Sequence, residues 1–175
     1  GLSSFNFLSV ISCVFYIGFF YHDYVIVSLS SSIIIFAILV FFLNFPFGKI
    51  FLGDSGSYIY AFFAGALIIY LFERQEQLPT LLAMVMLAYP ITEMLFSIFR
   101  KLYLGYSPLR PDINHLHHLV FKALAGNLKL RNNLASLIML PFCVTPFLLT
   151  YFSINYNLED NFLKFILYFI FYALT

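Results

Sequence analysis

The chain has 175 residues, of which 62% are hydrophobic and only 10% are charged. Soluble domains typically carry about 25% charged and 45–50% apolar residues, so a water-soluble fold of this size could not cover its surface with polar groups. The composition therefore excludes an ordinary soluble domain and predicts an all-α, polytopic integral membrane protein in the lipid bilayer. The formal net charge of +1 gives no excess of positive charge for binding nucleic acid, so we expect no nucleic acid among its partners.

Six apolar segments predict membrane-spanning helices. A spanning helix needs about 20 apolar residues, and lipid offers no partner for unpaired backbone groups, so helices are the expected form. Only His22 and Asp23 separate the first two segments, which predicts a helical hairpin, and the sixth segment is short. Cys13 and Cys143 lie inside apolar stretches and are expected to be packing residues. We expect a single transmembrane domain over residues 1–175 with spans at about 5–21, 24–43, 57–72, 79–99, 134–152 and 162–174.

When these spans alternate across the membrane, most of the basic residues fall on the same side. Seven of the nine fall on one side, which the positive-inside rule assigns to the cytoplasm. That side also receives two connections that we expect to carry function, residues 44–57 and 100–133. The sorting depends on all six spans being real. The seven basic residues are Lys49, Arg100, Lys101, Arg110, Lys122, Lys129 and Arg131.

The first motif is the run Gly53-Asp54-Ser55-Gly56-Ser57, where a connection enters a predicted span. In a purely structural interpretation, Ser55 or Ser57 caps the helix and Asp54 favours its positive end. In a functional interpretation, a carboxylate at the membrane boundary faces a ligand. Asp54 could then bind Mg²⁺, a hard cation that prefers oxygen ligands, while Lys49 could offset phosphate charge.

The second motif places three histidines within four positions, in a chain that has four in total. If this stretch is helical, His115 and His118 share a face three residues apart and His117 points elsewhere. Asp112 or Asn114 could cap such a helix.

Three interpretations of the histidines stay open. They could form a polar interfacial cluster without a ligand, or contribute two or three ligands to a zinc site. The interpretation we favour is recognition of a phosphorylated substrate, because Arg110 and the imidazoles can donate to phosphate oxygens from a basic loop.

Glu93 lies inside the fourth predicted span, about two turns before Arg100. A carboxylate at that depth is costly and should face protein or water. It could pair with Arg100 or Lys101, or it could belong to the site. Pro90, three residues earlier, is expected to kink the helix.

In their order and spacing, these motifs resemble the polyprenyl-phosphate N-acetylhexosamine-1-phosphate transferase family. The matching residues are KIFLGDSGS at 49–57, YPITE at 89–93 and SPLRPDINHLHH at 107–118. The form HLHH is similar to the branch that primes cell-surface glycans. Gly1 to Ser4 resemble the end of a further family motif, so we expect the C-terminal part of a larger membrane domain. One departure is Glu93, which stands where the family pattern has an aspartate.

The resemblance implies transfer of N-acetylhexosamine 1-phosphate from a UDP-sugar to polyprenyl phosphate, with undecaprenyl phosphate the bacterial form, releasing UMP as the first step of a glycan pathway. It also implies a bacterial cytoplasmic membrane location and Mg²⁺, or Mn²⁺, as the cofactor. A homodimer is one option for assembly, and we do not expect these residues alone to turn over substrate. The alternatives are an inactive structural membrane partner and, less favoured, a transporter.

The residues to which the resemblance gives roles fall into three groups. Asp54 is expected to be the metal-binding or catalytic carboxylate. Glu93 and Asp112 are further candidates. The expected substrate-binding residues are Lys49, Gly53, Ser55, Arg110, Asn114, His115, His117 and His118.

Overall fold

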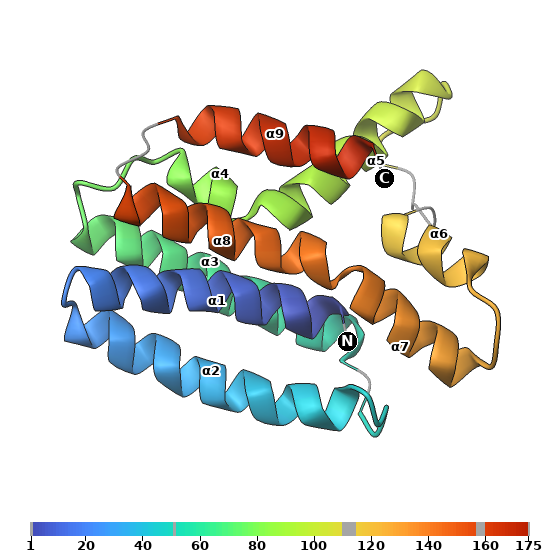
Figure 1. Ribbon diagram of the computed structural model, residues 1–175, viewed down its shortest axis with the longest axis horizontal. Helices are drawn as coiled ribbons and strands as arrows, with labels where there is room; N and C mark the ends of the chain where they lie inside the picture. The colour runs from blue at the N-terminus through green and yellow to red at the C-terminus, as the bar shows by residue number, and fades with distance from the viewer. Residues whose placement is uncertain (1, 51, 110–114, 157–159, 175) are drawn as a thin grey trace.

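The computed structural model describes residues 2–50, 52–109, 115–156 and 160–174, and every regular element within these ranges is an α-helix. The predicted all-α class is therefore confirmed for the described residues (Figure 1). The helices are α1 (Leu2–Phe20), α2 (Tyr24–Asn44), α3 (Gly53–Arg74), α4 (Leu82–Met86), α5 (Ala88–Tyr103), α6 (Leu116–Ala123), α7 (Leu128–Ile138), α8 (Leu140–Asn155) and α9 (Asn161–Ala173).

The long helices lie side by side, with α1 packed against α2, α3 and α8, and α9 packed against α4 and α5 (Figure 1). The α1–α2 turn, the α3–α4 connection, the last turn of α8 and the first turn of α9 lie at one end of the bundle. The N-terminus, the α2–α3 connection, α6 and α7 lie at the other end. The two connections that the sequence marked as functional therefore share one end, as the alternation of spans predicted.

The interior is apolar, and so is much of the outer surface. Ile11, Val14 and Ile17 of α1 are fully buried against the neighbouring helices, whereas Phe36 of α2 and Phe62 of α3 are 59% and 70% exposed. Large exposed apolar side chains along the long helices fit a surface that faces lipid rather than water. Both cysteines are buried and free, in agreement with the predicted packing role.

Within the described ranges, four helical stretches are long and apolar enough to cross a membrane: α1, α2, α3 and the continuous stretch Leu128–Asn155. The sixth predicted span corresponds to α9, which has only 13 residues. The fourth is interrupted at Leu87, three residues before Pro90, and forms α4 and α5 in place of one helix. Proline carries no backbone N–H, so the Met86 carbonyl loses its usual helical partner there. A count of six spans is therefore not confirmed.

The hairpin predicted between the first two segments is present. His22 occupies the left-handed region with φ 55°, and Asp23 accepts hydrogen bonds from the backbone N–H groups of Val25 (3.1 Å) and Ile26 (3.2 Å). An aspartate that accepts these bonds satisfies two of the unpaired donors at the start of α2.

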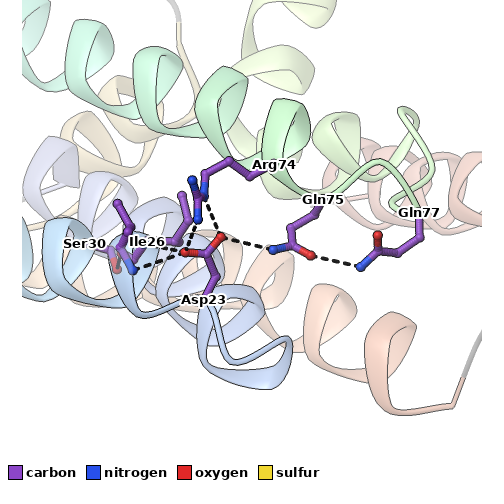
Figure 2. A network of polar contacts seen from close by, with 7 residues as sticks. Asp23, Ile26, Ser30, Arg74, Gln75 and Gln77 are labelled. Carbon is purple, nitrogen blue, oxygen red and sulfur yellow. Dashed lines mark hydrogen bonds and ion pairs between the residues drawn. The ribbon is translucent and has the colours of Figure 1, made fainter.

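Asp23 also ties the hairpin to the far end of α3 (Figure 2). Its Oδ2 accepts from Arg74 Nε at 2.6 Å and from Gln75 Nε2 at 3.2 Å, and Gln77 Nε2 in turn donates to Gln75 Oε1 at 2.9 Å. No role was predicted for these polar residues from the sequence. They fix one end of the helix bundle, opposite to the end where the two motifs lie.

Candidate functional site

The two predicted functional connections meet at one end of the bundle. Asn133, at the start of the long helical stretch, donates from Nδ2 to the Pro46 carbonyl oxygen at 3.2 Å. A cavity of about 460 Å³ lies between the connections, lined by Gly53 and Ser57 from one motif and by His117 and His118 from the other. The structure thus joins two motifs that are about 60 residues apart in the sequence.

The first motif forms the start of α3. Gly53 begins this helix with φ 62°, a left-handed conformation that glycine adopts without penalty, and Leu52 occupies the capping position without a side-chain hydrogen bond. Ser57 Oγ donates to the Gly53 carbonyl at 3.0 Å and so lies inside the helix. The predicted cap at Ser55 or Ser57 is therefore wrong, because the helix begins before both serines.

Asp54, Ser55 and Lys49 are exposed at this end of the molecule. Asp54 lies in the first turn of α3, where the helix dipole favours a negative charge. Lys49 Nζ lies 5.8 Å from the centroid of the Phe47 ring. None of the three is among the residues that line the described cavities.

In the second motif, Arg110, Asp112 and Asn114 lie outside the described residues. His115 occupies the N-cap position of α6 in an extended conformation, with φ −65° and ψ 152°. Its ring stacks on His117 with centroids 5.7 Å apart and an interplanar angle of 10°, and the rings of His117 and His118 are 4.2 Å apart. The expectation that His117 points elsewhere is wrong, because helical geometry starts only after His115.

Glu93 of α5 lies beneath this cluster of histidines. Its carboxylate is nearly buried, with the residue 8% exposed, and His115 Nδ1 lies 2.8 Å from Oε2. Tyr89 donates its hydroxyl to Oε1 at 3.2 Å, and His117 Nδ1 lies 3.8 Å from the same oxygen. The role of Tyr89 was missed in the sequence, although its spacing of four residues from Glu93 places both side chains on one helical face.

A second cavity, of about 1000 Å³, runs beside the first between α1, α3 and α5. Its walls are mostly apolar, with Phe7, Val10 and Ile98 among them. Ser57 and His117 line both cavities. A polar cavity and an apolar groove thus meet at His117.

His118 has an unusual electrostatic environment. Its ring is open to solvent on one side, yet partial burial, together with the neighbouring positive charges of His117, His115 and Lys122, lowers its pKa below the ordinary histidine value. Burial removes water from a charged ring and nearby cations repel a further proton, so both effects favour the neutral form.

The sequence is related to bacterial membrane transferases. It is 33% identical over 128 residues to the undecaprenyl-phosphate alpha-N-acetylglucosaminyl 1-phosphate transferase of Thermotoga maritima. The matched residues make up 73% of this chain and 36% of that relative. The protein of the same name in Pasteurella multocida is 35% identical over 100 residues, or 53% of this chain and 28% of the relative. Over these residues, the chain is similar to undecaprenyl-phosphate alpha-N-acetylglucosaminyl 1-phosphate transferases. This agrees with the resemblance seen in the motifs.

The similarity to these transferases is partial. A relative in Escherichia coli is 30% identical over 76 residues, which cover 43% of this chain and 21% of that protein. The chain spans at most 36% of the length of the relatives named here. No family model matches the chain. No solved structure matches it significantly.

The described residues do not form a complete metal centre. Within them, no group of three or more histidine, cysteine or acidic side chains is placed to hold a metal ion. The zinc interpretation of the histidines therefore gains no support from this part of the chain. For Mg²⁺, Asp54 offers one exposed carboxylate, which fits as a single ligand but is not a full set.

Proposed function

We propose that this chain forms part of a membrane enzyme that transfers N-acetylhexosamine 1-phosphate from a UDP-sugar to polyprenyl phosphate, in bacteria undecaprenyl phosphate, with release of UMP. The observation that carries the proposal is the junction at His117, where a polar cavity between both motifs meets an apolar groove. A polar nucleotide sugar and an amphiphilic lipid phosphate need such neighbouring spaces. The names of the relatives also contain both the lipid phosphate and the sugar phosphate.

The residues of the cavity suit phosphate recognition. His117 and His118 can donate from imidazole N–H groups, and exposed Lys49 can offer a cation close in sequence to the first motif. Phosphoryl transfer depends mainly on positioning and on stabilising charge. In the proposed reaction, an oxygen of the lipid phosphate attacks the β-phosphorus of the UDP-sugar. The bond from that phosphorus to its bridging oxygen breaks, and UMP leaves with the electron pair.

We also propose Asp54 as a ligand for Mg²⁺, or Mn²⁺, which when bound would neutralise phosphate charge. The described residues supply only this one carboxylate near the first motif. Further oxygen ligands would have to come from substrate phosphates and from parts of the relatives that this chain does not cover. Arg110, Asp112 and Asn114 remain proposed substrate-binding residues on the grounds of the motif alone.

The distribution of basic residues supports a proposed orientation in the membrane. Lys49 precedes α3, Lys122 ends α6, and Lys129 and Arg131 lie in the first turns of α7, all at the end that holds the site. A concentration of basic residues favours the cytoplasmic face. We propose that the site faces the cytoplasm of a bacterial inner membrane, and assembly into a homodimer stays a prediction.

The test is a transfer assay with the full-length protein in its membrane, following both UMP release and the lipid-linked sugar. We expect Asp54→Asn to lower the rate on the order of 10²–10³-fold without lowering the unfolding temperature. We expect His118→Ala to weaken use of the nucleotide sugar. Glu73→Gln is the matched control, because Glu73 is exposed at the opposite end of the same helix.

Three results would contradict the proposal. Near-normal UMP release by Asp54→Asn would remove the proposed role of the carboxylate. Absence of transfer by the unaltered full-length protein, in the presence of Mg²⁺ and undecaprenyl phosphate, would favour the structural membrane partner. Movement of a solute into vesicles without any lipid product would favour the transporter.

A further inference from the structure

Glu93 connects a membrane helix to the loop that carries the histidines. It lies in α5, one helical turn after Tyr89, and its partner His115 lies 22 residues further along the chain. Both carboxylate oxygens are engaged: Oε1 accepts from the Tyr89 hydroxyl, and Oε2 lies 2.8 Å from His115 Nδ1. The carboxylate is thus fixed from its own helix and meets a ring that comes from another element.

The same carboxylate faces a second histidine. The His115 and His117 rings are nearly parallel, and both present Nδ1 toward Glu93, at 2.8 Å from Oε2 and 3.8 Å from Oε1. The His117 Nδ1 atom is buried and has no hydrogen-bond partner among the described residues. In structures without bound substrate, hydrogen bonds of working groups are often long and shorten when the ligand binds.

A carboxylate at Nδ1 has a known effect on an imidazole ring. It favours the form that carries the proton on Nδ1, and it sets the orientation of Nε2. It also stabilises the charged ring, in which Nε2–H can donate a charge-assisted hydrogen bond to a phosphate oxygen. His117 lines both the polar cavity and the apolar groove, and His115 lines the groove, so both residues border the spaces proposed for substrates.

We propose that Glu93 is a positioning residue for the two histidine rings. It holds Nδ1 of His115, and it holds Nδ1 of His117 once substrate binds. Nε2 of both rings is then presented to substrate phosphate at the junction of the two cavities. This inference rests on the proposed function for the identity of the phosphate. The arrangement of the rings does not depend on it. His118, whose ring is tilted by 38° against the ring of His117, has no such carboxylate partner among the described contacts.

A purely structural role would be to dock α6 onto α5, and the two roles differ in what they predict. Docking requires only that the two helices stay together, and it leaves the ring tautomers and the turnover of folded protein unchanged. Positioning requires the negative charge itself. Thr92 supplies the matched control, because it is fully buried next to Glu93 in the same helix and its hydroxyl has no partner among the described residues.

The first experiment does not depend on activity. Full-length protein labelled with ¹⁵N-histidine is compared by NMR as the unaltered chain, Glu93→Gln and Thr92→Val. We expect the His115 Nδ1 signal of the unaltered chain to lie in the protonated range, to move toward the unprotonated range in Glu93→Gln, and to stay in place in Thr92→Val. An unchanged His115 signal in folded Glu93→Gln would overturn the proposal.

The second experiment measures transfer kinetics. We expect Glu93→Gln to lower kcat about 10- to 100-fold with little change in KM for the lipid acceptor, and Glu93→Asp to restore part of the rate. Because Glu93 acts through the ring, Glu93→Gln should add little to His115→Gln in the double variant. Losses that multiply in the double variant would show independent roles and overturn the proposal.

The outcomes separate this inference from the proposed function. If the unaltered full-length protein transfers no sugar phosphate, the proposed function fails, and the NMR comparison still decides whether Glu93 fixes the tautomer of His115. If transfer is robust and Glu93→Gln matches Thr92→Val in rate and spectrum, the positioning role fails alone. Should Glu93→Gln unfold, the same comparisons are made with Glu93→Asp, for which an unchanged spectrum and rate count against the proposal.

Discussion

Arg74, in the last turn of α3, donates to both carboxylate oxygens of Asp23, which lies 51 residues earlier in the chain, with distances of 2.6 Å from Nε and 3.1 Å from Nη2. Asp23 is also the residue that caps α2. One side chain therefore closes the hairpin and attaches it to α3 at the end of the bundle away from the two motifs. The guanidinium beside Asp23 holds the pKa of this carboxyl below its usual value.

We expect Asp23→Ala to destabilise the protein more than Arg74→Gln does. Loss of the cap leaves two N–H groups at the start of α2 without their partner, at a cost of about 1 kcal/mol. Arg74 is partly exposed, so loss of its pair is screened by solvent. Thermal unfolding in detergent can be followed with a thiol-reactive dye, because Cys13 and Cys143 are buried until the helices separate. Equal unfolding temperatures for Asp23→Ala and Glu73→Gln would contradict this prediction.

Gly18 marks the closest approach of the two hairpin helices. A Cβ at this position would lie 2.5 Å from Ile26 Cγ2 and 3.4 Å from the Val27 nitrogen. We expect Gly18→Ala to destabilise the hairpin by about 1–3 kcal/mol, because the neighbouring helix cannot move without breaking the cap at Asp23. The same unfolding assay measures the loss.

Gly65 gives the matched control, since a Cβ there would meet nothing within 4 Å. Gly65→Ala should be neutral or stabilising, because alanine favours a helix interior. Removing Cγ2 by Ile26→Ala should make the double variant with Gly18→Ala less destabilised than the sum of the two single variants. Additive losses would show that Gly18 and Ile26 do not interact in the way that the structure indicates.

The fold was predictable where hydropathy and turn residues act locally. The segments expected at 5–21 and 24–43 correspond closely to Leu2–Phe20 and Tyr24–Asn44, since long apolar runs have few alternatives in lipid. The fourth segment was expected to form one kinked span and instead forms two helices, interrupted at Leu87. A hydropathy sum counts apolar side chains, but it does not record that Pro90 lacks a backbone N–H group to donate within the helix.

The site was predictable as a meeting of two connections, but its contacts were not. The alternation of spans placed the histidines and Gly53 at one end, and the cavity confirms that they lie together. The pair of Glu93 with His115 depends on the path of a long connection, which the sequence does not specify. The predicted arrangement of His117 was wrong because it required a helix through His115, where the backbone is extended.

The conformation of Gly53 should be required for the placement of Asp54. Because Gly53 has φ 62° at the first residue of α3, a side chain there costs about 1–2 kcal/mol, and relief of that strain would change the first turn. We expect Gly53→Ala to lower sugar-phosphate transfer more than Gly53→Asn, because asparagine tolerates the left-handed region better. Tyr58→Phe is the control, because Tyr58 is exposed near the start of the same helix and lines neither cavity. Equal activity of the alanine and asparagine variants would show that the conformation of Gly53 does not matter for the site.

The docking of α6 should weaken in mild acid because of His118. Its pKa is lowered in the folded protein, first by partial burial and then by the charges of His117, His115 and Lys122. The unfolded or undocked state therefore binds a proton more readily. The stability that neutral His118 provides is present above its unfolded pKa of about 6.5, and it is lost as the pH falls through and below that value.

We expect amide hydrogen exchange in α6 to accelerate between about pH 6.5 and pH 5, after correction for the intrinsic exchange rate. This loss of protection should be smaller in His118→Asn. His22→Asn, in the α1–α2 turn at the opposite end of the bundle from α6, should behave like the unaltered protein. The same loss of protection in His118→Asn and in the unaltered chain would assign the change to other groups in the cluster, with Glu93 and its partner His115 the next pair to test.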